Sequence, residues 1–139
     1  IRLMDGSLFV HSPVQLSDAT RAKVDEHGVV KHIVSPNKLH HLYMGDWADA
    51  YPAAKLYASP GLGKKRGDLR FEATLGDTPE PPWDGEIDQC VFRGSVFMEE
   101  VVLQTIMGWK AERVLLIHGP CVTVGAQAFL ENGFAWLAP

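Results

Sequence analysis

Short apolar runs alternate with more polar stretches along the first 60 residues. Strands are predicted at Leu8-Phe9-Val10-His11, from Val29 to Ser35 and at Lys55-Leu56-Tyr57-Ala58, because each run is short and rich in β-branched or aromatic residues. Strands separated by helix-length stretches are typical of an α/β domain. In such domains the functional loops gather at the ends of the strands.

Two helices are predicted between these strands. The first is capped by Ser17 or Asp18, whose side chains satisfy backbone N–H groups at a helix start, and it ends at Gly28. The second runs from His41 to Tyr51, where apolar residues recur at helical spacing, and it stops before Pro52. The order of elements is therefore strand, helix, strand, helix, strand.

The region after residue 58 has a different character and is predicted to be β-rich surface structure. Pro60 to Gly67 is glycine-rich and basic, but it lacks Walker spacing and a clear strand-to-helix pattern, which favours a solvated loop over a phosphate cradle. Thr78 to Pro82 is expected to be extended because of its prolines. Ile87 to Phe92 and Ser95 to Val102 are predicted strands, joined by a tight turn at Arg93-Gly94.

Composition limits the classes of function. With 139 residues and 46% hydrophobic content the chain can form one domain, and no apolar run approaches the roughly 20 residues of a membrane span. A net charge of −4 disfavours nucleic acid as a partner. Cys90 and Cys121 are expected to be buried thiols in a reducing compartment. The chain starts at Ile1 as a trimmed fragment, so a cytoplasmic location is the default expectation.

The strongest chemical signal is a pair of histidines after the second predicted strand. The apolar residues at 33–34 lead into a polar loop that carries His40 and His41, and a second strand-like run, Val114 to Ile117, ends at His118. Neutral imidazole is the commonest metal ligand in proteins. The sequence therefore predicts a metal site at the strand ends, with hydrogen bonding to the loop backbone as the alternative role of His40 and His41.

A series of short motifs runs along the chain in a fixed order. These motifs are Ser35-Pro36-Asn37-Lys38-Leu39-His40-His41, Trp47, Tyr51-Pro52, Ala54-Lys55-Leu56-Tyr57-Ala58, Pro60-Gly61-Leu62, Lys64-Lys65-Arg66, Trp83, Glu86-Ile87-Asp88-Gln89, Glu99-Glu100-Val101-Val102, Trp109, Glu112-Arg113-Val114 and His118-Gly119. Taken together, they resemble a bacterial family of uncharacterised proteins related to the metallo-β-lactamase superfamily. The resemblance covers nearly the whole of residues 1–139, as a single domain. It implies an αββα sandwich of two sheets with helices on both outer faces and a metal site at one edge.

The chain departs from the superfamily's metal-binding signature, which is a histidine, a second histidine two positions later, and then Asp-His. Pro36 and Lys38 stand where the first two histidines belong, His40 replaces the aspartate, and His41 keeps the last histidine. Proline has no side-chain ligand atom and lysine is a cation, so the usual two-zinc site is incomplete. His118 matches the closing histidine of the superfamily.

The resemblance also predicts a missing internal segment. Related sequences carry a long segment, with a further histidine and aspartate, after the positions that match Glu99-Glu100-Val101-Val102. In this chain Val102 is followed directly by Leu103. The chain is therefore expected to be truncated at its N-terminus and gapped after residue 102. An omitted segment is favoured over a natural deletion, because a deletion would remove core strands.

Two functions from different classes fit these observations. In the first, one zinc or other divalent ion held by His40, His41 and His118 lowers the pKa of a bound water to about 7, and the hydroxide attacks an ester, lactone or similar bond. Asn37 and Lys38 would bind the small-molecule substrate. In the second, the chain is a metal-free, non-catalytic binding or scaffold module. Neither function involves nucleic acid or a membrane.

The other titratable residues give weaker signals. His11 ends the first predicted strand and lies at the same edge, where a structural role is favoured. His27 and His32 are predicted to lie at the surface without a functional role. Asp46 and Asp49, on the helix after the histidines, are expected on a solvated face, although a bridging carboxylate or general base could come from there or from Glu99-Glu100.

Overall fold

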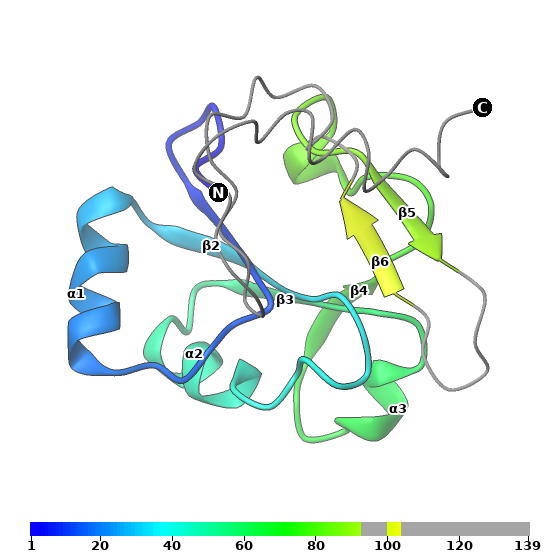
Figure 1. Cartoon of the computed structure of the whole chain (residues 1–139), viewed down its shortest axis with the longest axis horizontal. Helices are drawn as coiled ribbons and strands as arrows, with labels where there is room; N and C mark the ends of the chain where they lie inside the picture. The colour runs from blue at the N-terminus through cyan, green and yellow to red at the C-terminus, as the bar shows by residue number, and fades with distance from the viewer. Residues whose placement is uncertain (93–99, 104–139) are drawn as a thin grey trace, which may run out of the picture. The chain divides into compact units, whose positions relative to one another are not determined.

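The computed structural model describes residues 1–92 and 100–103. The chain divides into two units, Ile1–Val102 and Leu103–Pro139, and the first contains all the elements described below apart from the last residue of β6. Four parallel strands form one sheet, in the order β1-β2-β3-β4, and two further strands, β5 and β6, form a second sheet (Figure 1). The elements are β1 (Leu8–His11), α1 (Asp18–His27), β2 (Val30–Ser35), α2 (Met44–Ala50), β3 (Lys55–Ala58), α3 (Leu62–Lys65), β4 (Phe71–Thr74), a 3₁₀ helix (Pro81–Trp83), β5 (Gln89–Phe92) and β6 (Glu100–Leu103).

The first half of the chain confirms the α/β prediction. β1 and β3 have the predicted bounds, and β2 starts one residue later than predicted. Ser17 is the N-cap of α1, where its hydroxyl oxygen accepts a hydrogen bond from the backbone N–H of Thr20 at 3.1 Å. Gly28 closes α1 with φ 148°, and a Cβ at this position would lie 2.5 Å from the carbonyl oxygen of Gly6. Only glycine fits there.

Three predictions for the middle of the chain were wrong. α2 begins at Met44 rather than His41, because the preceding residues form a separate turn. The region after β3 was predicted to be a solvated loop without a strand-to-helix pattern, but α3 and β4 follow β3 in order. Pro81–Trp83 forms one 3₁₀ turn within a stretch expected to be extended, and proline is tolerated because the first N–H groups of a helix need no partner within it.

All three helices pack on one face of the parallel sheet. Ile33 in β2 and Leu56 and Ala58 in β3 share one buried cluster with Met44 and Trp47 of α2 and Leu62 of α3, and Val24 of α1 packs against the same cluster. Parallel strands in sequential order require crossover connections of one hand, which place successive helices on the same side. This packing fixes where each loop emerges at the carboxyl edge of the sheet.

Aromatic rings cover the opposite face. Trp83 is fully buried and makes edge contacts with Phe9 at 4.9 Å and with Tyr57 at 4.7 Å between ring centroids. His32 joins this group, 5.4 Å from the Trp83 ring, and is 6% exposed. The prediction that His32 lies at the surface was therefore wrong. Its neighbours in the sequence are polar or β-branched, and its ring contacts are with the distant residues Tyr57 and Trp83.

The remaining expectations for this region are settled only in part. β5 and β6 lie side by side as two strands, but the turn at Arg93-Gly94 is outside the described residues. Cys90 is half-buried and outside any disulfide, while Cys121 lies beyond the described range. Within residues 1–92 and 100–103, no helix has the length and hydrophobicity that a bilayer crossing requires.

Candidate functional site

The loop that follows β2 is organised by the side chain of Asn37. This residue is 1% exposed, and its Oδ1 accepts hydrogen bonds from the backbone N–H groups of Leu39 at 2.8 Å and His40 at 2.9 Å. The hydroxyl of Ser35 donates to the carbonyl oxygen of Asn37 at 2.9 Å. Asn37 thus turns the chain directly after the strand, by the side-chain mimicry of a backbone turn that asparagine favours.

Pro36 joins this loop to the second sheet. It is buried, and its carbonyl oxygen accepts a hydrogen bond of 2.9 Å from the backbone N–H of Val101 in β6. Val101 is 2% exposed. Pro36 therefore has a structural contact with β6.

The ring of His40 accepts a hydrogen bond from Asn37. Nδ2 of Asn37 lies 3.0 Å from Nδ1 of His40. The amide orientation follows from Oδ1, which already accepts from two backbone N–H groups, so Nδ2 must face the ring and donate. Nδ1 of His40 is then the unprotonated nitrogen, and the neutral ring carries its proton on Nε2. His40 as a whole is an exposed residue.

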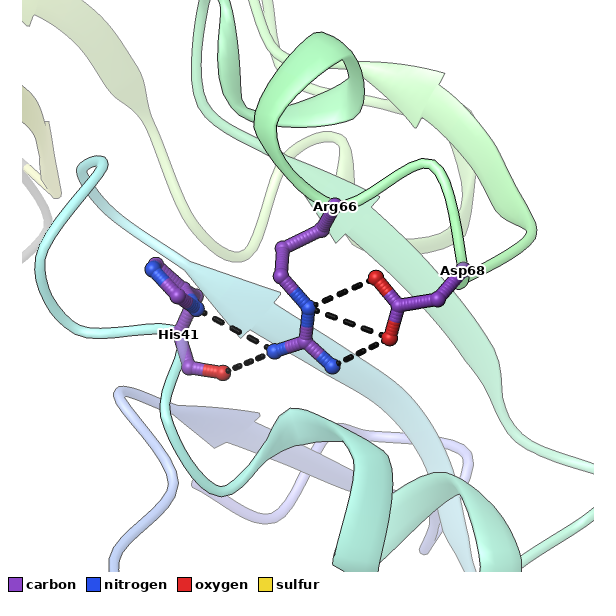
Figure 2. Close-up of polar contacts among 3 residues, drawn as sticks. All are labelled: His41, Arg66 and Asp68. Atoms are coloured by element: carbon purple, nitrogen blue, oxygen red, sulfur yellow. Dashed lines mark hydrogen bonds and ion pairs between the residues drawn. The ribbon is translucent and has the colours of Figure 1, made fainter.

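His41 is held in the same tautomer by Arg66 (Figure 2). Nη1 of Arg66 lies 3.1 Å from Nδ1 of His41 and 2.9 Å from its carbonyl oxygen. Guanidinium has only donors, so Nδ1 accepts and Nε2 bears the proton. Arg66 is fixed in turn by Asp68, through contacts of Nε at 2.8 Å and Nη2 at 2.7 Å to the carboxylate. The three residues form one chain of charge-assisted contacts.

Electrostatics keep His41 neutral. Burial lowers the pKa of the His41 imidazole, because water is displaced from its charged form, and the cations of Lys65 and Arg66 lower it further. His41 as a whole is only 7% exposed. The hydrogen bonds that Arg66 donates to the Asp68 carboxylate raise the pKa of Arg66 and lower that of Asp68. A neutral imidazole beside a fixed guanidinium–carboxylate pair is the result.

These contacts do not fit a metal site built on His40 and His41. A metal at Nε2 requires the ring proton on Nδ1, where it would face the N–H of Asn37 or the guanidinium of Arg66 with no acceptor between them. Nδ1 of each ring is already occupied by a donor. Within the described residues, no group of three or more His, Cys, Asp or Glu side chains is placed to hold an ion.

Lys38 and Gly61 meet at the ends of neighbouring strands. Gly61 has φ 76°, a conformation that favours glycine, and a Cβ there would lie 3.2 Å from Cε and 3.4 Å from Nζ of Lys38. Lys65, at the end of α3, donates from Nζ to the carbonyl oxygen of Lys38 at 2.8 Å. Lys38 therefore lies over the loop that follows β3.

His11 lies near His40, as its position at the end of β1 predicts. The protein around the ring displaces water and lowers the pKa of His11, although the residue is exposed overall. The sheet thus brings together residues from the ends of β1, β2 and β3. Asp46 and Asp49 are exposed on α2, in line with the solvated face expected for them.

Several expectations for the site stay predictions. His118 and Glu99 lie outside the described residues, and so does any metal ligand after Leu103. The missing segment after Val102 is likewise untested. Sequence reasoning overlooked Arg66 and Asp68, because the basic stretch was interpreted as solvated. The signal that could have revealed them is an arginine two residues before an aspartate, just after the apolar Leu62 that anchors the loop.

Comparison with known proteins places the chain in one family. Residues 1–128 match the family described as a domain of unknown function, DUF4336. None of the curated proteins matches the chain. Because the family match spans well over half of the 139 residues, the chain belongs to the DUF4336 family.

Proposed function

We propose that this chain is a metal-free binding module that holds a small-molecule ligand at the carboxyl edge of its parallel sheet. The observation that carries the proposal is the engagement of both Nδ1 atoms: His40 accepts from Asn37 and His41 accepts from Arg66. Each ring then presents an N–H rather than a lone pair. A hydrogen-bond donor recognises a ligand, whereas a metal needs a lone pair.

The position of the edge supports a binding role. In open α/β sheets, ligands bind outside the carboxyl ends of the strands, where loops from neighbouring strands meet. Here the loops after β1, β2 and β3 supply His11, Lys38, His40 and Gly61. Lys38 is the residue that we propose to contact the ligand. Asn37 is buried and supports the loop, so its direct contact with a ligand stays a prediction.

For the whole fold we propose the metallo-β-lactamase-like αββα sandwich that the resemblance implies. Two separate sheets, together with helices packed on one face of the first, support this arrangement. In this proposal the chain keeps the fold and the ligand-binding edge of that superfamily without its metal chemistry.

Elemental analysis of the purified full-length protein tests the function. The protein is prepared at neutral pH without chelator, beside His41→Ala and the matched control His27→Ala, which changes an exposed histidine on α1. We expect transition-metal content far below one ion per chain in all three proteins. One zinc or similar ion per chain that is lost in His41→Ala and kept in His27→Ala would establish the metal-dependent hydrolase instead.

A further inference from the structure

We infer that the ligand of this edge carries an oxyanion, such as a carboxylate or phosphate, which accepts hydrogen bonds from the Nε2–H groups of His40 and His41. This inference rests on the proposed function and names the ligand class of the same site. Its first support is the shared tautomer of the two adjacent rings, each set by a donor on Nδ1. Two N–H donors require acceptors, and the oxygens of an oxyanion are strong acceptors.

The direction of the His41 ring gives the second support. Figure 2 shows its far ring nitrogen turned away from Arg66 and Asp68. No described residue accepts a hydrogen bond from this nitrogen, although the residue is 7% exposed. This nitrogen is not among the described side-chain atoms that are buried without a partner, so water or a ligand can reach it and accept its hydrogen bond.

The local charge selects an anion rather than a neutral acceptor. Residues 59–70, between β3 and β4, carry four cationic side chains and one acidic one in a chain whose net charge is −4. Arg66 is neutralised by Asp68, with a shortest contact of 2.7 Å. Lys65 reaches the loop of the histidines through the Lys38 carbonyl and lowers the pKa of His41. The edge therefore combines neutral N–H donors with ammonium groups.

Matched small probes test the inference without any substitution. Full-length protein with ¹⁵N-labelled histidine is titrated at constant ionic strength with inorganic phosphate, acetate or acetamide, and the Nε2–H signals are followed by NMR. We expect a saturable shift of the His41 signal with phosphate or acetate and none with acetamide, which has the shape of acetate but no charge. A response to acetate alone identifies a carboxylate ligand, and a response to phosphate a phosphate ligand. The absence of a saturable shift with either anion, or an equal response to acetamide, overturns the inference.

Variants separate the donor from its surroundings. His41→Gln keeps an N–H near the position of Nε2 and should retain anion binding, whereas His41→Leu should abolish it. Lys65→Met should weaken binding roughly two- to fivefold, the usual size of one exposed charge interaction, and Lys23→Met on α1 should leave it unchanged. Equal binding by His41→Leu and the unaltered chain would contradict the role of His41.

The failures of the two proposals are distinguishable. A stoichiometric metal ion bound at His41 refutes the metal-free function itself. A metal-free protein whose histidine signals ignore both anions refutes only the oxyanion ligand.

Discussion

Nη1 of Arg66 donates to both polar atoms of His41 that face it, the ring Nδ1 at 3.1 Å and the backbone carbonyl oxygen at 2.9 Å. The same guanidinium is held by Asp68. One side chain therefore sets the position of the loop and the tautomer of its histidine together. This relationship decides which chemistry the edge of the sheet can support.

Removal of Arg66 should destabilise the loop. Arg66→Met deletes the hydrogen bonds to His41 while it keeps much of the apolar stem, and it should lower the free energy of unfolding by about 1–3 kcal/mol, the cost of leaving buried acceptors unpaired. Asp68→Asn is the matched control. Asp68 is 61% exposed, so its loss of charge should cost less than about 1 kcal/mol. Urea unfolding measures both, and equal effects would place the stabilisation in the exposed ion pair.

Asn37→Asp should reverse the tautomer of His40. One carboxylate oxygen still accepts from the N–H groups of Leu39 and His40. The other oxygen is an acceptor that stands in place of the amide donor facing Nδ1 of the ring. The ring proton then moves to Nδ1, and Nε2 is left unprotonated with a free lone pair. Histidine ¹⁵N chemical shifts report the change directly. If His40 kept its proton on Nε2 in Asn37→Asp, Asn37 would not be what sets the tautomer.

Stability should fall in acid because of His32. Burial among Trp83 and Tyr57 lowers the pKa of this imidazole below 6.5, and its Nδ1 is buried without a partner in the described part of the chain. Below pH 6.5, His32 therefore binds a proton more readily in the unfolded chain than in the folded chain. His32 leaves the free energy of unfolding unaffected above pH 6.5. Its titration lowers this free energy as the pH falls from 6.5 toward the pKa of His32 in the folded chain.

His32→Phe tests this pH dependence. Phenylalanine fills the aromatic cluster without a titrating group, so the decline below pH 6.5 should become shallower by up to about 1.4 kcal/mol per pH unit. His41 shifts in the same direction and leaves a residual slope. Denaturant midpoints at several pH values measure the effect. An unchanged slope in His32→Phe would show that His32 is not the source.

Gly61 should be intolerant of a side chain. Gly61→Ala forces a non-glycine residue into φ 76° and brings a Cβ within 3.4 Å of Nζ of Lys38. We expect a loss of about 1–2 kcal/mol in the free energy of unfolding from the backbone alone. Gly67→Ala is the control, because a Cβ there meets nothing within 4 Å. Thermal unfolding compares them, and an equal loss in both variants would contradict the conformational argument.

Local patterns predicted the first three strands and α1 because each element has its own signal in the sequence. Ser17 caps α1 through a contact only three residues away, and the apolar run of β3 is buried as a whole. β4 was missed since its sequence, Phe-Glu-Ala-Thr, is half exposed and carries a charge. The burial of His32 depends on Trp83, 51 positions away in the sequence. Long-range packing of this kind leaves no local pattern.

For the site, the sequence drew attention to the loop after β2 but left two kinds of chemistry open for its histidines. A histidine pair at a strand end is equally consistent with metal ligands and with hydrogen-bond donors. The difference lies in what faces Nδ1, and that is decided by the amide of Asn37 and by Arg66, which is 25 positions from His41. The resemblance to a metal-binding superfamily favoured ligands, whereas these contacts favour donors.

The tautomer of His41 tests the account most directly. Its ring nitrogens are assigned by ¹⁵N NMR in full-length protein purified without chelator, before and after addition of EDTA. The account predicts a proton on Nε2, an unprotonated Nδ1, and identical spectra in both samples. A proton on Nδ1 together with a metal-bound Nε2 signal that disappears with EDTA would contradict it.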